Sequence, residues 1–454
     1  MSVTRFGLIG HPVAHSLSPA IHGALLQAAG RSGTYDLIDL EPDHLAVRLP
    51  GLLQRYDGLN CTIPHKQAVI PFLDCLDESA RRNHAVNTIC GRTGHNTDES
   101  AFADDCPPLA GLSVLILGAG GVSRTMAVSA LRQQAAVVRL LARRSEQARQ
   151  LADELRSEHP DADIAAITQI GDLDPLLTVD LNHTGSTWVL LNGTPAGLWP
   201  HTDGLPFPAD RLAGFRFIYD TVYNPVATRL VLAAREQKIP AYGGLGMLFG
   251  QAVSSQRIWQ PGISWPRQTL SQIRQGLARE ILRRFPVQIL LTGFMGSGKT
   301  TTGRLVAARL KLPFVDLDEQ IAIKEGRSIP DIFASVGEAG FRRIEHSCLE
   351  SCLASGTSQV LATGGGALLE SAAQTLLRQF PCQVIWLDAS LPATEQRIGH
   401  GTGRPLIERQ QPEAWRDLYV KRRPLYQQLA WLRVNADEPA ESVSRQIIET
   451  LGFN

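Results

Sequence analysis

The chain has 454 residues, enough for two to four domains with separate cores, and its 44 basic residues balance its 44 acidic ones. This balance argues against nucleic acid or an anionic membrane surface as a partner. The seven cysteines form no Cys-x-x-Cys pair, and the sequence shows neither a signal peptide nor an apolar run long enough to span a bilayer, so we expect a soluble cytoplasmic protein.

Short apolar runs alternate with helical patterns along most of the chain, which is typical of an α/β fold with parallel sheets. The clearest runs are residues 6–9, 113–117, 137–141, 217–219, 287–291 and 384–387. Residues 260–266 break regular structure, and a helical pattern over Arg267–Arg284 follows. We expect this stretch to join two separate units.

Polar side chains gather after the first predicted strands. They lie in Gly10–Pro19, Asn60–Lys66, Ala85–Thr88 and Asn96–Asp98. Open α/β sheets bind ligands at strand ends, and a set of hydroxyl, amide and charged groups suits a polyhydroxylated molecule. Taken singly, each Ser or Asn is more simply explained as a cap or turn residue.

The segment from Ser113 to Arg124 is a buried strand that runs into a glycine turn and then a helix. This order predicts a dinucleotide site, where backbone amides and the helix dipole hold a pyrophosphate. Ser123 stands where a third glycine is usual, and its small side chain should still allow close packing. The predicted cofactor residues of this turn are Gly118, Ala119, Gly120, Gly121 and Val122.

The next strand, residues 137–141, ends where an NAD enzyme would place an acid against the ribose. Here the chain reads Ala142-Arg143-Arg144, without an acid. Two guanidiniums suit a ribose 2′-phosphate, so NADP is favoured over NAD. The alternative is that these are ordinary solvated arginines.

Residues 1 to about 265 resemble shikimate dehydrogenase. The matching motifs are His15–Pro19, Asn60–Lys66, Ala85–Ile89, Asn96–Asp98, Gly118–Arg124, Asn192–Leu198, Asp220–Pro225 and Gly244–Gln251. The resemblance implies a shikimate pocket formed by Ser16, Ser18, Thr62, Asn87, Asp98, Tyr223 and Gln251, and places Gly244 with the cofactor. It also implies that Lys66 and Asp98 are the catalytic pair. An ammonium can stabilise and protonate the alkoxide that forms when hydride reaches a ketone.

The chain departs from that family at three places. Gly23 follows His22 where Asn is frequent, and Glu99 follows Asp98 where Gly is usual. The cofactor motif Asn-Arg-Thr is replaced by residues 142–144, in which Arg143 keeps its place.

A glycine-rich loop follows the apolar run 287–291 directly and precedes a helical pattern. It reads Gly293-Phe-Met-Gly-Ser-Gly-Lys299-Thr300, the spacing of a P-loop. Its amides would close around the phosphates of a nucleoside triphosphate, Lys299 would reach their outer oxygens, and Thr300 would offer its hydroxyl to Mg²⁺. The predicted ATP-binding residues are Gly293, Gly296, Ser297, Gly298, Lys299 and Thr300.

Three further segments follow the P-loop. A strand is predicted over residues 312–318, where alternation would put Asp316 and Asp318 on one face, one near Mg²⁺ and one on the acceptor hydroxyl. Gly364, Gly365 and Gly366 would let backbone approach a ligand closely. Residues 397–409 have the composition of a lid, from which an arginine could reach the transferred phosphoryl group.

Residues 286–454 resemble shikimate kinase. The resemblance implies that Asp318, Arg342, Gly364, Gly365, Gly366 and Arg422 form the shikimate site. It implies that Asp318 orients the hydroxyl and accepts its proton, that Lys299 and Arg404 stabilise phosphoryl charge, and that Arg397 lies near the adenine. Mg²⁺ would be held by Thr300 and, through water, by Asp316.

Together these features predict a bifunctional enzyme of aromatic amino-acid biosynthesis. It would reduce 3-dehydroshikimate with NADPH and phosphorylate the product with ATP. The predicted domains are 1–103 with 240–265 for substrate, 104–239 for NADP as a Rossmann fold, a helical linker at 266–285, and a P-loop kinase at 286–454. Quinate or another small polyol as substrate, and a non-catalytic shikimate sensor, are the alternatives. The oligomeric state, monomer or homodimer, is left open.

Overall fold

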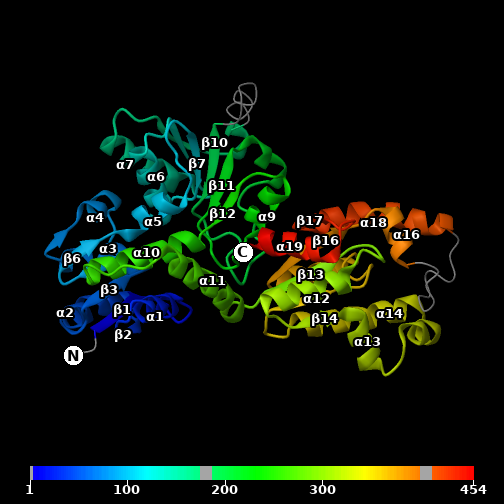
Figure 1. Cartoon of the computed structure of the whole chain (residues 1–454). Helices are drawn as coiled ribbons and strands as arrows, with labels where there is room; N and C mark the ends of the chain where they lie inside the picture. Colours follow the sequence, from blue (N-terminus) through cyan, green and yellow to red (C-terminus); the bar gives the residue numbers. More distant parts are fainter. Residues whose placement is uncertain (1–3, 174–186, 399–411, 454) are drawn as a thin grey trace. The chain divides into compact units, whose positions relative to one another are not determined.

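Figure 1 shows the computed structural model of the chain, which describes residues 4–173, 187–398 and 412–453. By their contacts, the residues divide into two compact units. The first comprises Met1–Pro195, Pro206–Tyr223 and Ile239–Ala278, and the second comprises Ala196–Leu205, Asn224–Lys238 and Arg279–Asn454. In the described ranges, no helix has both the length and the apolar character needed to cross a bilayer. The domain limits predicted from motifs stay a prediction.

The first sheet of the first unit has the strand order β2-β1-β3-β5-β6-β4. Its strands are β1 (Thr4–Gly10), β2 (Gly33–Asp39), β3 (Gly58–Cys61), β4 (Cys75–Leu76), β5 (Thr88–Cys90) and β6 (Thr93–His95). The helices of this region are α1 (Ser18–Ala28), α2 (Leu45–Arg55), α3 (His65–Ala68), α4 (Glu78–Asn83), α5 (Thr97–Asp105) and α10 (Leu245–Trp259).

This sheet is mixed, because β5 runs antiparallel to both β3 and β6. β1 and β3 are parallel, and their carboxyl ends lie side by side, with Ile9 opposite Cys61. The amino end of β5 lies at the same edge, since Thr88 is opposite Asn60. The carboxyl end of β6 lies there too, since His95 is opposite Thr88. The topology therefore brings all four predicted polar segments, those after β1, after β3, before β5 and after β6, to one edge of the sheet.

The second sheet is fully parallel, with the order β12-β11-β10-β7-β8-β9. Its strands are β7 (Ser113–Leu117), β8 (Val137–Leu141), β9 (Ile164–Ile167), β10 (Trp188–Asn192), β11 (Phe217–Asp220) and β12 (Ala241–Gly243). The helices α6 (Gly121–Arg132) and α7 (Ser145–Glu158) connect its first three strands. The strand order reverses between β7 and β10, which confirms the predicted Rossmann architecture and locates its ligand crevice.

The third sheet, in the second unit, is also parallel and has the order β14-β15-β13-β16-β17. Its strands are β13 (Gln288–Thr292), β14 (Phe314–Asp316), β15 (Gln359–Ala362), β16 (Cys382–Asp388) and β17 (Leu432–Asn435). The helices are α9 (Arg229–Glu236), α12 (Lys299–Leu310), α13 (Leu317–Glu325), α14 (Ile329–Leu353), α15 (Ser371–Gln379), α16 (Leu391–Ile398), α18 (Pro412–Leu429) and α19 (Ala440–Leu451). α11 (Arg267–Arg284) matches the helix predicted between the two halves.

One predicted strand is wrong at its end. The strand expected over 312–318 is β14, which stops at Asp316, and α13 begins at Leu317. Asp316 is the N-cap of α13, and its side chain accepts a hydrogen bond from the backbone N–H of Asp318 at 3.1 Å. Because an aspartate at this position satisfies a free helical N–H, capping ends the strand before alternation reaches Asp318.

Replacement of Leu290 by Ala should lower the stability of the second unit by about 2–5 kcal/mol. Leu290 is fully buried in the central strand β13, so the truncation leaves a cavity beside the P-loop. The urea midpoint for loss of ATP-dependent activity measures the effect. Ile323→Ala is the matched control, since Ile323 is 73% exposed and its removal should leave the midpoint unchanged. Equal midpoints for both variants would contradict the assignment of Leu290 to the core.

Candidate active sites

The predicted catalytic pair meets in the first unit. Lys66, in α3, donates a hydrogen bond from Nζ to Oδ2 of Asp98, in the first turn of α5, at 2.7 Å. Burial alone would lower the pKa of Lys66, but the charge and the hydrogen bond of Asp98 outweigh it, and the pKa is raised. Lys66 therefore remains a protonated donor at neutral pH.

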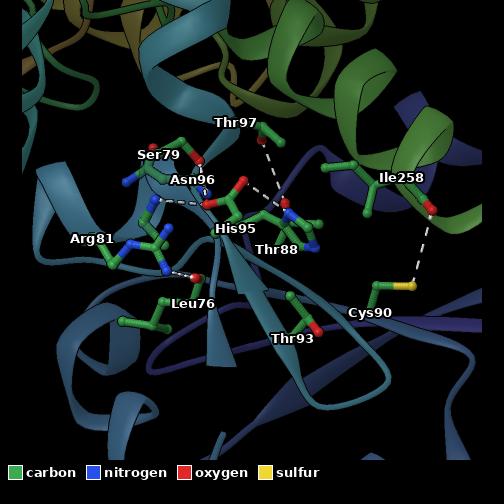
Figure 2. A network of polar contacts seen from close by, with 12 residues as sticks. Leu76, Ser79, Arg81, Thr88, Cys90, Thr93, His95, Asn96, Thr97 and Ile258 are labelled. Atoms are coloured by element: carbon green, nitrogen blue, oxygen red, sulfur yellow. Dashed lines mark hydrogen bonds and ion pairs between the residues drawn. The ribbon is translucent and has the colours of Figure 1, made fainter. Parts of the chain in front are cut away.

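The start of α5 is held by a network of side-chain contacts, part of which Figure 2 shows around the end of β6. Oδ1 of Asn96 accepts from the backbone N–H of Asp98 at 3.1 Å, and Oγ of Ser79 accepts from the backbone N–H of Asn96 at 2.9 Å. Oδ1 of Asn87 accepts from the backbone N–H of Thr97 at 2.8 Å. Because the backbone at the helix start is fixed, the direction of the Asp98 side chain is fixed with it.

Asn87 is 3% exposed, and its amide also donates to Oγ1 of Thr97 at 2.9 Å. The structure thus gives Asn87 a role in holding α5, next to the ligand contact predicted for it. Ser16 and Ser18 lie together at the start of α1, where Oγ of Ser16 donates to Oγ of Ser18 at 3.1 Å.

The remaining predicted substrate residues come from separate elements. Thr62 follows β3 and lies against Gly10, since a Cβ added at Gly10 would be 2.4 Å from Cγ2 of Thr62. Tyr223 follows β11, and Gln251 lies in α10, where its Nε2 donates to the carbonyl of Leu248 at 3.0 Å. That these groups contact one ligand stays a prediction.

The predicted dinucleotide turn connects β7 to α6. Gly118 has φ +97°, a conformation that side chains rarely adopt. Ser123 is fully buried under the turn, and a Cβ added at Gly193 would lie 2.4 Å from its Oγ. A small residue is therefore required at position 123, as expected from the missing third glycine.

The N-terminus of α6 offers backbone donors. Its N-cap is Gly120, which has no side chain to cap the first turn, so the amides of Gly121 and Val122 are free to bind an anion. Gly120 and Gly121, together with Ala119, line a cleft of about 230 Å³. This arrangement is compatible with pyrophosphate binding at the turn, which stays a prediction.

Two guanidiniums follow β8. Arg143 and Arg144 are exposed, and no ion pair in the described part of the chain involves either one. Gly244 lies against the end of β11, where its N–H donates to the carbonyl of Val222 at 3.0 Å. A Cβ at Gly244 would be 2.0 Å from the carbonyl oxygen of Thr221, so only glycine fits.

The P-loop of the second unit joins β13 to α12 through glycines in left-handed conformations, with φ +145° at Gly293, +78° at Gly296 and +88° at Gly298. Nζ of Lys299 donates to the carbonyl oxygens of Gly293 at 2.9 Å and Phe294 at 3.1 Å, which folds the lysine back over the loop. Ser297, in the same loop, is buried.

Thr300 and Asp316 lie in contact beside this loop. Oγ1 of Thr300 donates to Oδ2 of Asp316 at 2.7 Å. Two hard oxygen ligands are thus adjacent to the phosphate cradle, which fits the predicted magnesium position.

A cleft of about 530 Å³ extends from the P-loop across the ends of β14 and β15. It brings together nearly all of the residues predicted for the kinase site. The lining residues that were predicted from the sequence are Gly296, Gly298, Lys299, Thr300, Asp316, Asp318, Arg342, Gly364, Gly365, Gly366, Arg397 and Arg422.

Arg342 is held by a buried acid that was not among the residues predicted from the sequence. Its Nη1 donates to Oε2 of Glu345 at 2.6 Å, and the side chain of Glu345 is 5% exposed. Burial raises the pKa of Glu345, and the guanidinium of Arg342 opposes that rise. The only available signal was the spacing of three residues along one helix.

The three glycines leave room for these charged groups. A Cβ at Gly366 would be 2.9 Å from Nη1 of Arg342, and one at Gly364 would be 2.8 Å from Oε1 of Glu345. The hydroxyl of Tyr426 donates to the carbonyl of Gly365, which ties α18 and its Arg422 to the loop.

α18 is also tied to the sheet by charge. Asp388, at the end of β16, is buried and accepts from Arg423 at 2.9 Å and from Arg433 at 2.8 Å. On the side predicted for adenine, Nη2 of Arg397 donates to the carbonyl of Asp437 at 3.1 Å. Arg404 and most of the predicted lid lie outside the described residues.

Comparison with protein families identifies both halves. Residues 8–89 match the shikimate dehydrogenase substrate binding domain, and residues 295–452 match shikimate kinase. A shikimate dehydrogenase (NADP(+)) of Moorella thermoacetica is 35% identical over 261 residues, which are 56% of this chain and 86% of the relative.

Solved structures agree with the dehydrogenase assignment. A chorismate mutase/shikimate 5-dehydrogenase fusion protein from Clostridium acetobutylicum matches with a TM-score of 0.54 and 28% identity, over 62% of this chain and 99% of its own. A shikimate 5-dehydrogenase from Thermus thermophilus, in complex with NADP(H) and shikimate, matches with a TM-score of 0.51 and 30% identity, over 60% of this chain and 99% of its own. The chain therefore belongs to the shikimate dehydrogenase family, with a shikimate kinase domain following on the same polypeptide.

Proposed function

We propose that this bifunctional enzyme of the shikimate pathway reduces 3-dehydroshikimate to shikimate with NADPH and then phosphorylates shikimate to shikimate 3-phosphate with ATP. The proposal is supported by two groups of side chains that the described residues of this one chain bring together. These are the Lys66–Asp98 pair at 2.7 Å and a P-loop that opens into the cleft of Asp318, Arg342 and Arg422.

In the first reaction, NADPH supplies the hydride to the ring ketone when it is bound. The developing alkoxide needs a proton, and Lys66 is a charged donor whose pKa is held up by Asp98 against the effect of burial. Asp98 keeps the ammonium in place through their hydrogen bond. Arg143 and Arg144 are available to bind the 2′-phosphate that distinguishes NADP from NAD.

In the second reaction, Asp318 is the group that orients the shikimate hydroxyl and accepts its proton. Arg342 and Arg422 line the same cleft and suit the substrate carboxylate, because guanidiniums bind carboxylates in bidentate fashion. Lys299 lies on the P-loop, ready to reach the outer phosphate oxygens.

Magnesium belongs to this proposal because Thr300 and Asp316 present adjacent oxygens beside the P-loop. These residues would hold the ion, whose charge offsets that of the phosphates. A cytoplasmic location is supported by the cysteines, since all seven are unpaired in the structure. The assembly, monomer or homodimer, can be distinguished by light scattering.

Quinate or another polyol as substrate, and a sensor without turnover, are the alternative proposals. Steady-state rates with each candidate separate the substrates. A sensor would not need a protonated lysine held against an aspartate, or a lysine on the phosphate loop, and the chain has both.

A coupled assay tests the whole proposal. With dehydroshikimate, NADPH and Mg-ATP, the full chain should form shikimate 3-phosphate. Lys299→Ala should stop at shikimate, and Lys66→Ala should lower dehydroshikimate reduction by about 10²–10⁴-fold while still phosphorylating added shikimate. Lys324→Ala, on the exposed side of α13, is the control. Loss of both activities from either single variant would contradict two separate centres.

Replacement of Asp98 by Asn should move the alkaline limb of the kcat/KM profile for dehydroshikimate to lower pH by about one unit or more. Asp98 is what raises the pKa of Lys66, so without its charge burial dominates and the lysine loses its proton earlier. Asp104→Asn, an exposed position of the same helix, should leave the limb unchanged. An unmoved limb in Asp98→Asn would show that Lys66 is not the titrating group.

Replacement of Arg143 and Arg144 together by Ser should raise the KM for NADPH about 10–100-fold, the value of one or two charge-assisted hydrogen bonds. The KM for NADH should stay unchanged, because NADH has no 2′-phosphate. Arg149→Ser, further along α7, is the matched control, since Arg149 pairs with Glu146 on the surface. Equal losses with both cofactors would rule out recognition of the 2′-phosphate by these arginines.

A further inference from the structure

Glu99 is a buried carboxylate next to the catalytic aspartate, and the proposed chemistry does not use it. It is 2% exposed and lies in the first turn of α5, directly after Asp98. A buried charge is stable only when it is paired and hydrogen-bonded. The partners of Glu99 therefore show which elements its charge connects.

The partners of Glu99 come from two other helices. Nη1 of Arg132, the last residue of α6, donates to Oε1 at 2.5 Å. From α4, Nδ2 of Asn83 donates to Oε2 at 2.6 Å, and Nη2 of Arg82 lies 3.4 Å from the same oxygen. Glu99 thus joins the start of α5 to both α4 and α6.

Glu99 and Asp98 are held on different sides of the same helical turn. Successive residues of an α-helix point about 100° apart, so a contact made by one residue restrains the direction of the next. Asp98 points to Lys66, with 2.7 Å between the charged atoms, while Glu99 points to Arg132 and Asn83. Any rotation of α5 about its axis would break both contacts together.

We propose that Glu99 is a positioning residue of the dehydrogenase, whose ion pair with Arg132 fixes the rotation of α5 and so keeps Asp98 aligned with Lys66. This inference rests on the proposed function of the first unit. Glu99 acts through Asp98 and not through the cofactor. Gly121 and the nucleotide turn lie at the other end of the 12-residue helix α6, roughly 17 Å from Arg132 at 1.5 Å per residue.

The test is a mutant cycle on the full chain. Glu99→Gln keeps the volume and can still accept from Asn83, but it loses the charge that faces Arg132. We expect kcat for dehydroshikimate reduction to fall about tenfold, because small misplacements of catalytic groups have effects of this size or larger. The KM for NADPH should change less than twofold.

Arg132→Gln should have a similar effect, and the double variant should be no slower than the slower single one, since each single variant already breaks the Glu99–Arg132 ion pair. Arg132→Lys, which keeps the charge, should retain most of the rate. Arg156→Gln is the control, because Arg156 pairs with Asp153 on the surface of α7.

Wild-type kcat in Glu99→Gln and Arg132→Gln, with only a lower melting temperature, would overturn the proposal and leave Glu99 a structural residue. A rise in the KM for NADPH at constant kcat would overturn it as well. Arg132 is 53% exposed at its side chain, so Arg132→Gln carries the test if Glu99→Gln fails to fold. A wild-type chain that does not reduce dehydroshikimate would refute the proposed function instead.

Discussion

Both nucleotide sites of this enzyme depend on backbone conformations that only glycine adopts without strain. In the first unit, β7 turns at Gly118 with φ +97°, and in the second, β13 turns at Gly293 with φ +145°. Each turn leads directly into a helix, so free amides and the positive end of the helix face the same point. A side chain at either glycine would also meet its neighbours, Ser123 in one turn and Ser297 in the other. In the proposed function, the catalytic side chains act on nucleotides that these two turns would hold.

Around these turns, the two centres use charge in a similar way. In each, a cation that we propose to contact the substrate is held by a carboxylate that is less exposed than the cation itself, Asp98 for Lys66 and Glu345 for Arg342. Such a pair costs desolvation energy, which a hydrogen bond of good geometry offsets. The gain is orientation, since a long flexible side chain is kept in one direction before substrate arrives.

Much of this arrangement could be predicted because its signals are local. The strands 113–117 and 137–141, the helix 267–284 and both glycine turns follow from apolar runs and short motifs. Prediction failed where two local signals compete, as at Asp318, because the capping preference of Asp316 prevails over strand alternation. It also missed Glu345 as the partner of Arg342. Glu99 departs from the family motif, but its pairing with Arg132, 33 positions away, is not revealed by any local pattern.

One carboxylate of the kinase half has a consequence for how this sequence can vary. Asp388 serves Arg423 and Arg433 together, and both guanidiniums lie near the ring of Trp386, at 5.9 and 5.3 Å from its centre. If a neutral residue replaced Asp388, two cations would face each other without a counter-charge. A neutral substitute for Asp388 should therefore be accompanied by loss of one of the two arginines. Among homologues, we therefore expect the residues at positions 388, 423 and 433 to covary.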